Sequence, residues 1–161
     1  MTIDERAEEQ RPRDAARMVE VGAKDVTERE ARASCVVSMT PRACERLVAG
    51  TPKGDPLEAA RVAGLMGAKR TPELLPFCHP VAITGAEVIV EPEPAQGRVV
   101  IRTTIRARDR TGVEMEALTA AALAALSIYD TAKAYDRAAV ISDLKLLEKS
   151  GGKSGEYRRD G

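Results

Sequence analysis

Residues 113–135 limit the possible folds more than any other segment of the chain. They predict one long helix whose middle, residues 117–129, is apolar on almost every face. A helix of this kind must be buried on most sides, by the core of its own domain or by another subunit. With 161 residues, the chain has the length of one domain. We therefore expect a single domain over residues 17–161, preceded by a charged, disordered segment over residues 1–16.

The remaining patterns place strands and shorter helices around the long helix. Alternating and β-branched stretches predict strands at residues 33–40, 81–91, 98–108 and 139–148. Thr40-Pro41 and Asp55-Pro56 each combine an N-cap residue with proline, which predicts helices from 41 to about 50 and from 57 to about 69. This order of elements predicts an α+β, ferredoxin-like split-βαβ fold, an antiparallel sheet with helices packed on one face. Residues 149–161 would form a flexible loop rich in glycine and lysine.

Composition excludes several classes of function. The 25 basic and 25 acidic residues give no net charge, and no block of like charge indicates a nucleic-acid or membrane tail. One Phe, three Tyr and no Trp provide no platform for stacking bases. No apolar stretch reaches the roughly 20 residues of a membrane span, and the polar start lacks a secretory signal. We expect a cytoplasmic protein that binds neither nucleic acid nor membrane.

The single histidine, His79, lies in a loop closed by Pro76 and Pro80, with Cys78 beside it. Proline restricts both ends of this loop, so it could be a structural turn or a rigid support that presents an imidazole and a thiol. The pentapeptide alone leaves both interpretations open. A protease-like Cys–His pair is disfavoured because no third, orienting group is evident. One histidine and no CxxC motif predict no metal site.

Asp130 and Lys133 continue a helical stripe formed by Thr119, Leu123 and Leu126. They could be an i,i+3 surface ion pair, which contributes a few tenths of a kcal/mol. We expect the apolar stripe to be buried, however, and buried charges are paired and often have shifted pKa values. That expectation favours a catalytic pair.

Three other segments remain ambiguous from their residues alone. Lys53 lies in a turn before Asp55, where ordinary turn chemistry explains the sequence equally well. Residues 149–155 carry two lysines among glycines and could wrap an anion or fray; a Walker loop is excluded because Leu147 stands at its first glycine position. The acids around Met115 begin the long helix, where its dipole alone favours them.

Several blocks in fixed order together resemble a known family. They are Met18-Val-Glu-Val, Lys53-Gly-Asp, Leu75-Pro-Phe-Cys-His-Pro80, Thr111-Gly-Val-Glu-Met-Glu-Ala-Leu-Thr-Ala120, Tyr129-Asp130 with Lys133-Ala134, and Lys149-Ser-Gly-Gly-Lys-Ser-Gly155. From about residue 18 to 157, the chain resembles the molybdenum cofactor biosynthesis protein C family, the cyclic pyranopterin monophosphate synthases. Phe77 stands where the family more often has Leu, and Thr131-Ala132 where it often has Met-Cys.

The resemblance implies a lyase that needs no cofactor, although Mg²⁺ could accompany its triphosphate substrate. The implied reaction converts a cyclised dihydroguanosine triphosphate into cyclic pyranopterin monophosphate and pyrophosphate. Lys53 and Lys133 would be the acid–base pair, and Asp130 would orient Lys133. This chemistry requires several proton transfers, which positioned lysines can perform.

The resemblance also implies the substrate-binding residues. Arg29, His79 and Lys149 would bind the phosphates, and Lys153 would close over them. Cys78, Met115 and Glu116 would line the pterin, with Phe77 and Glu114 also in the substrate site.

The family forms homohexamers, each a trimer of dimers, with the active site at the dimer interface. A non-enzymatic, ferredoxin-like nucleotide-binding module is the competing hypothesis. It would leave Asp130 and Lys133 unexplained, and turnover of the triphosphate would separate the two. An RNA-binding sheet is weaker still, because stacking aromatics are absent.

Overall fold

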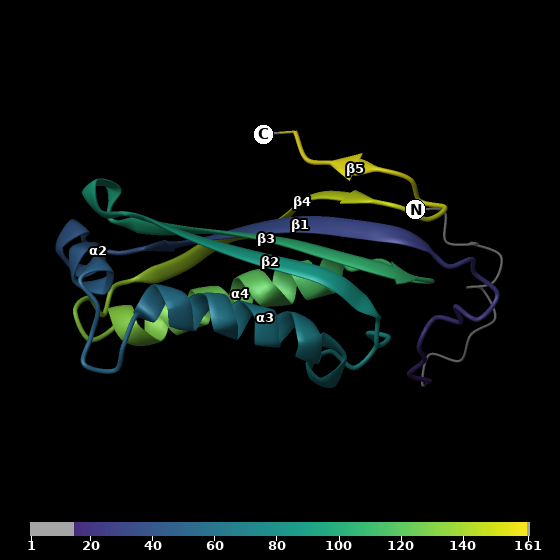
Figure 1. The fold of residues 1–161 in the computed structure, drawn as a ribbon, viewed down its shortest axis with the longest axis horizontal. Coiled ribbons are helices and arrows are strands. Elements are labelled where there is room, and N and C mark those ends of the chain that lie inside the picture. The colour runs from purple at the N-terminus through teal and green to yellow at the C-terminus, as the bar shows by residue number, and fades with distance from the viewer. Residues whose placement is uncertain (1–14, 161) are drawn as a thin grey trace.

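A computed structural model describes residues 15–160, which form one sheet covered on one face by helices (Figure 1). The elements in chain order are β1 (Thr27–Ser38), α2 (Pro41–Val48), α3 (Pro56–Leu74), β2 (Ile83–Glu93), the 3₁₀ turn η1 (Pro94–Gln96), β3 (Arg98–Asp109), α4 (Glu114–Ala132), β4 (Val140–Ser150) and β5 (Tyr157–Arg158). The strands have the order β2-β3-β1-β4-β5, and every neighbouring pair is antiparallel. The predicted α+β fold with a ferredoxin-like arrangement is confirmed.

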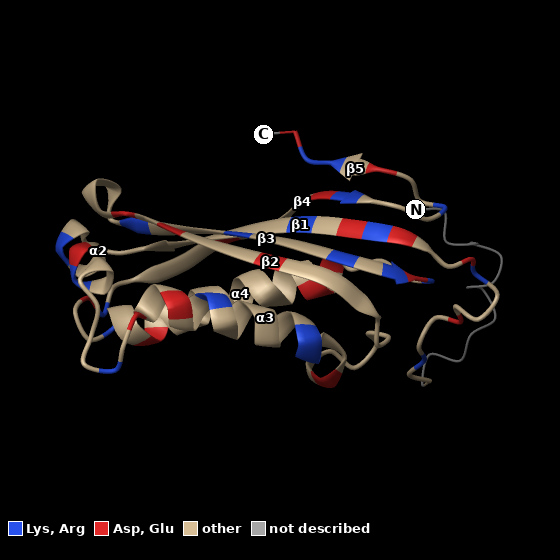
Figure 2. Cartoon of the chain, in the orientation of Figure 1, with Lys and Arg blue, Asp and Glu red and all other residues tan. Residues whose placement is uncertain are grey.

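Small side chains allow α4 to pack closely against the sheet and α3. Ala31, Ala33 and Cys35 of β1 are fully buried, as are Ala120 and Ala124 of α4. Among residues 15–160, the buried hydrophobic side chains include no aromatic residue, so the core is filled by close packing of small and aliphatic side chains. α4 runs along the sheet beside α3, and its middle carries no charged residue (Figures 1 and 2).

One expectation about α4 is wrong for this chain. The stripe that leads to Asp130 is the less buried side of the helix, and Leu126 is 52% exposed. The buried side passes instead through residues 117, 120, 121, 124, 125, 128 and 132. Because so many positions of α4 are apolar, the sequence pattern could not identify which face the sheet covers.

Several element boundaries differ from the predicted ones by two or three residues; α4, for example, ends at Ala132 and not near residue 135. Larger differences occur in β1 and α3. β1 begins at Thr27 and not at residue 33. Its first half was missed because residues 28–30 are all charged and Ala31 is the single apolar residue there, so no apolar alternation is present. α3 continues past residue 69 to Leu74, although Pro72 lies in its last turn. The short β5 had no sequence signal. The predicted disordered segment 1–16 lies almost entirely outside the described residues.

The face of the sheet opposite the helices is covered by arginine–glutamate pairs. Arg106 of β3 pairs with Glu30 of β1 at 2.6 Å, and Arg98 pairs with Glu93 at 2.5 Å. The predicted alternation of apolar and basic residues in β3 is therefore confirmed, with the arginines on the wet face.

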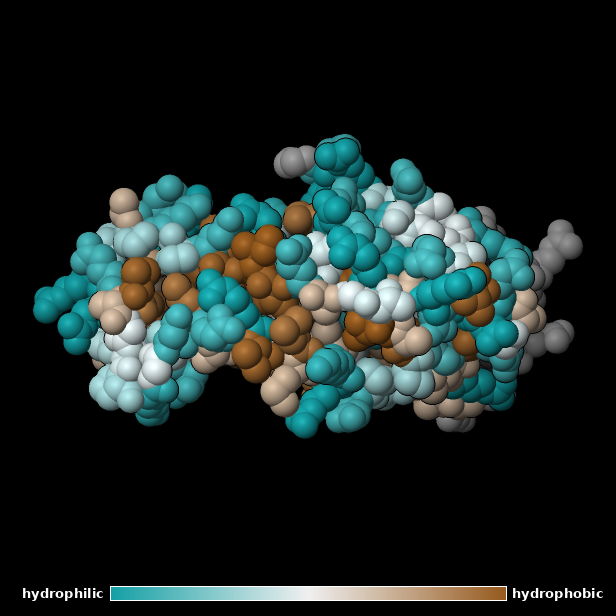
Figure 3. Space-filling view, viewed as in Figure 1, coloured by the Kyte–Doolittle hydropathy of each residue, from teal (hydrophilic) through white to brown (hydrophobic). Residues whose placement is uncertain are grey.

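The molecule also exposes apolar side chains. Figure 3 shows hydrophobic residues gathered along the middle of one face of the molecule. Val62 and Met66 of α3 and Ile89 of β2 are each more than one-third exposed. Within residues 15–160, no helix is both long and apolar enough to cross a membrane.

Candidate active site

The predicted site residues gather at the two ends of α4. The lysine–aspartate cluster (Lys53, Asp130 and Lys133) lies at the C-terminal end of this helix. The α4 N-terminal cluster (Arg29, Cys78, His79, Glu114, Glu116 and Lys149) lies around its start. Glu116 and Lys133 are 17 residues apart on or next to one helix, which places them roughly 25 Å apart along its axis.

Within the lysine–aspartate cluster, Lys133 Nζ lies 2.7 Å from Asp130 Oδ1. The hydrogen bond and the charge of Lys133 lower the pKa of Asp130, and Asp130 raises the pKa of Lys133 in return. Both side chains are exposed, 72% for Asp130 and 56% for Lys133. The expected buried pair is thus wrong for the single chain, and the Lys133 pKa shift favours the ammonium form.

Lys53 lies at the same end of the molecule, in an exposed turn between α2 and α3. Thr51 and Gly54 close this turn with two backbone hydrogen bonds of 3.1 and 2.9 Å. The positive charge of Lys53 contributes to the lowered pKa of Asp130, so the two residues belong to one electrostatic environment within one chain. The structure therefore brings all three predicted catalytic residues to one end.

In the α4 N-terminal cluster, the half-buried thiol of Cys78 contacts the buried carboxyl of Glu116. Cys78 Sγ lies 3.6 Å from Glu116 Oε1, and Glu116 is only 1% exposed. Glu116 Oε2 is buried without a hydrogen-bond partner among the described residues. Burial raises the pKa of Glu116, and burial together with the Glu116 carboxylate raises the pKa of Cys78 to about 11. This thiol is therefore a hydrogen-bond donor at neutral pH and not a nucleophile.

Lys149 joins the same cluster from the end of β4. Its ammonium lies 3.1 Å from Glu114 Oε1 and 2.9 Å from Ser154 Oγ. The predicted tail therefore starts two residues later than expected, at Gly151, because Lys149 and Ser150 still belong to β4. Lys153 lies exposed in the loop between β4 and β5.

Arg29 of β1 lies beside Gly151 and Gly152, which begin the loop between β4 and β5. The guanidinium donates to the carbonyls of Asp109 and Arg110 at 3.3 and 3.2 Å. Gly152 has a φ of 75°, and a side chain there would overlap the Arg29 guanidinium. Glycine at this position lets the loop approach Arg29 closely.

His79 lines a hollow that it shares with Asp109, Arg110 and the segment 18–22. Asp109 organises this region, since its carboxylate accepts from the backbone N–H of Ala82 at 2.9 Å and of Arg110 at 2.7 Å. No sequence pattern indicated Asp109, because an aspartate at the end of a strand looks like an ordinary turn residue.

The two remaining predicted residues, Phe77 and Met115, have side chains that are 58% and 43% exposed. Both lie beside the Cys78–Glu116 pair in sequence, one in the loop after α3 and one in the first turn of α4. They offer apolar surface at the mouth of the cluster.

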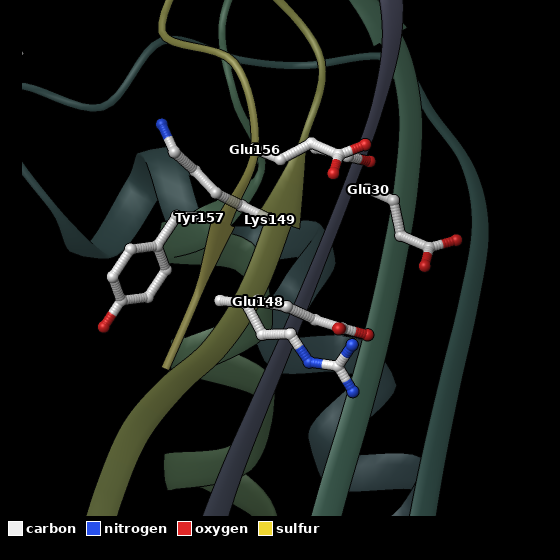
Figure 4. Close-up of a pocket in the computed structure, with 7 residues that line it drawn as sticks. Glu30, Glu148, Lys149, Glu156 and Tyr157 are labelled. Atoms are coloured by element: carbon white, nitrogen blue, oxygen red, sulfur yellow. The ribbon is translucent and has the colours of Figure 1, made fainter. Parts of the chain in front are cut away.

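A second hollow lies between β1, β4 and β5 (Figure 4). Its lining includes three acids, Glu30, Glu148 and Glu156, together with the cations Lys149 and Arg158. Figure 4 shows that the Lys149 side chain points away from Glu30 and Glu148, consistent with its contact to Glu114. This hollow therefore borders the α4 N-terminal cluster through Lys149, and the ammonium of Lys149 belongs to that cluster. Among residues 15–160, no three His, Cys, Asp or Glu side chains form a group that could hold a metal ion.

The fold and the two clusters together define a ferredoxin-like α+β domain. One end of α4 carries the amines of the lysine–aspartate cluster, and the other end carries a thiol, acids and cations. The model of the MoaC family matches residues 18–152. The chain belongs to the MoaC family.

Named relatives agree with this membership. The chain is 58% identical to the cyclic pyranopterin monophosphate synthase of Streptomyces griseus over 146 residues, which cover 90% of this chain and 81% of the relative. It is 53% identical to the protein of the same name from Pelotomaculum thermopropionicum over 150 residues, 92% of this chain and 88% of the relative. The protein of that name from Rhodospirillum rubrum is 52% identical over 141 residues, 87% of this chain and 85% of the relative.

Proposed function

We propose that this chain is a cytoplasmic cyclic pyranopterin monophosphate synthase. Its substrate would be (8S)-3′,8-cyclo-7,8-dihydroguanosine 5′-triphosphate, and its products cyclic pyranopterin monophosphate and pyrophosphate. Membership of the MoaC family and the names of its relatives support the activity. The observation that carries the proposal is the pairing of Lys133 with Asp130 beside Lys53, which supplies amines and a carboxylate for proton transfer.

The states of these groups suggest roles for them. Asp130 holds Lys133 as an ammonium, which fits a general acid that donates a proton as a ring opens. Lys53 would then be the base. During ring closure, a substrate hydroxyl oxygen would bond to the α-phosphorus and give its proton to the base. The bond from the α-phosphorus to the oxygen that bridges it to the β-phosphorus would break, and pyrophosphate would leave with the electron pair of that bond.

The α4 N-terminal cluster fits the other parts of the substrate. Arg29, His79 and Lys149 would bind the phosphates, with Lys153 closing over them, since cations stabilise the charge of the departing pyrophosphate. Cys78 and Glu116 would face the pterin rings, because a thiol and a buried carboxyl can bind ring N–H and carbonyl groups. Phe77, Met115 and Glu114 would complete this wall.

Separation of the clusters favours a site shared between two chains. A general acid or base must approach within about 3 Å of the reacting atom. Lys133 and Glu116 of one chain are roughly 25 Å apart, too far to serve one ring system. We therefore propose a homo-oligomer, a hexamer built as a trimer of dimers, in which the lysine–aspartate cluster of one chain meets the α4 N-terminal cluster of its partner. Exposed apolar side chains such as Leu126 and Met66 are suited to such contacts.

Magnesium, if it takes part, would enter with the triphosphate. The described residues hold no ready group of metal ligands, and Mg²⁺ commonly binds through substrate phosphates. The protein would then contribute cations to the same phosphates and need no resident cofactor.

Turnover tests this proposal. Purified protein should convert the cyclised triphosphate into cyclic pyranopterin monophosphate with one pyrophosphate per product, measured by chromatography and a pyrophosphate assay. Lys133→Ala should bind the substrate without turnover. Substrate binding by the wild type without pyrophosphate release would refute the enzyme and support the binding module.

A further inference from the structure

The short helix α2 precedes the turn that carries Lys53 and contacts the segment that follows Lys133. It follows β1 and leads directly into the turn with Lys53. The residues just after Lys133 contact both the beginning and the end of this helix. None of these contacts involves a residue of the two clusters.

Asp136 holds the beginning of α2. The N–H of Thr40, the N-cap residue, donates to Asp136 Oδ2 at 2.7 Å, while Thr40 Oγ1 accepts from the N–H of Ala43 at 3.3 Å. In a capping box, an acidic or amide side chain at the third helical position makes the bond to the N-cap N–H. Here that position is Ala43, so Asp136 makes the bond from a distant part of the chain. Its other oxygen accepts from Ala138 at 2.9 Å, which fixes the carboxylate to its own loop.

Tyr135 holds the end of α2. The guanidinium of Arg46, in the last turn of the helix, lies 5.5 Å from the centre of the Tyr135 ring. This distance is within the range of a cation–π interaction. The backbone then turns at Gly50, whose N–H donates to Leu47 at 3.1 Å, and enters the closed turn that carries Lys53. The position of Lys53 is therefore set by the position of α2.

We propose that Asp136 and Tyr135 are positioning residues that, through α2, fix Lys53 relative to the Asp130–Lys133 pair. The inference rests on the proposed function, because it assigns these contacts to the same proton-transfer site. Neither residue would touch the substrate. Their effect is on the separation of the two amines, and small misplacements of catalytic groups cost up to about a hundredfold in rate.

Steady-state kinetics of Asp136→Ala and Tyr135→Leu test the proposal. We expect kcat to fall at least about tenfold while KM stays within about twofold, because the phosphate-binding residues lie at the other end of the molecule. Tyr135→Phe keeps the ring and should retain near wild-type kcat. Glu58→Ala is the matched control, since Glu58 is an exposed carboxylate at the same end whose ion pair within residues 15–160 is with Arg61 at 2.9 Å. It should change neither constant.

A distance measurement keeps the inference separate from the enzyme assignment. Nitroxides attached to Lys53→Cys/Lys133→Cys in a Cys78→Ser background, diluted with unlabelled chains, report the separation of the two positions by pulsed electron paramagnetic resonance. The distribution should broaden or shift with Asp136→Ala and remain unchanged with Glu58→Ala. Unchanged distances and kcat in folded Asp136→Ala and Tyr135→Leu would overturn the inference, as would a Tyr135→Phe defect equal to that of Tyr135→Leu. Absence of turnover in the wild type would refute the proposed function alone, and the distances would still decide the positioning role.

Discussion

At the scale of single residues, the proposed catalytic role of Lys133 rests on an exposed ion pair with Asp130. Lys133 and Asp130 are half or more exposed, so their contact adds little to stability. Lys133→Ala should leave the fold intact and abolish turnover. Lys133→Arg should lose at least about a hundredfold in kcat, because guanidinium keeps the charge but cannot give up its proton. Circular dichroism and steady-state kinetics check both variants. Near wild-type turnover by Lys133→Arg would show that the charge matters and proton transfer does not.

Glu116 provides a prediction about pH. Burial raises its pKa, so the folded protein binds this proton more tightly than the unfolded chain does. Stability from this group is present below the unfolded pKa and is lost as pH rises through the folded pKa. Glu116→Gln, which cannot ionise, should match the wild type at acidic pH and be more stable than the wild type at neutral pH. Urea denaturation across this pH range measures the difference.

The exposed Glu87 offers a control for that experiment. Glu87→Gln should give no difference that grows with pH. A Glu116→Gln variant that is less stable than the wild type at neutral pH would show that the buried carboxylate has a compensating partner in the folded protein.

At the scale of elements, glycines in α3 allow the two long helices to approach. A side chain at Gly67 would meet Leu123 Cβ at 3.1 Å and the carbonyl of Thr119 at 3.2 Å. Gly67→Leu should therefore destabilise the fold by about 1–3 kcal/mol or more, the usual cost of overpacking. Ala59→Leu, at an exposed position of α3, should have little effect. Thermal denaturation compares the two, and equal melting temperatures would show that α3 and α4 can separate without cost.

Much of this architecture could be predicted from local patterns. Thr40-Pro41 and Asp55-Pro56 predicted the starts of α2 and α3, and alternation predicted β2 and β3, because caps, proline and side-chain period act over a few residues. The first half of β1 was missed because its strand conformation depends on pairing with β3. That pairing joins residues far apart in the sequence, such as Glu28 and Arg108. The buried face of α4 was missed for a similar reason, since an apolar helix does not indicate which neighbour covers it.

For the candidate site, the sequence predicted which residues belong to it but not how they are distributed in the fold. The residues of the two clusters were named from the sequence through resemblance, and their roles stay predictions. Their distribution between two ends of the molecule depends on the length and direction of α4, which motif spacing does not reveal. Asp109 and Asp136 were missed because each acts through backbone N–H groups of another element, and those contacts exist only in the folded chain.

At the scale of the whole molecule, the proposed activity depends on a site that is shared between two chains. Lys53, Asp130 and Lys133 of one chain would act with Lys149 and its neighbours of another. Symmetric dimers have two such sites, each built from opposite ends of the two chains. This arrangement predicts how much activity a mixture of two inactive variants recovers.

Subunit mixing is the most direct test of this claim. Lys133→Ala and Lys149→Ala, each inactive alone, should recover about a quarter of the wild-type activity after exchange, because half of the dimers are mixed and half of their sites are intact. Lys53→Ala mixed with Lys133→Ala should recover nothing, because both lysines lie in one cluster of one chain. Native mass spectrometry shows the extent of exchange. Failure of the first pair to complement after complete exchange, or recovery by the second pair, would contradict the shared site.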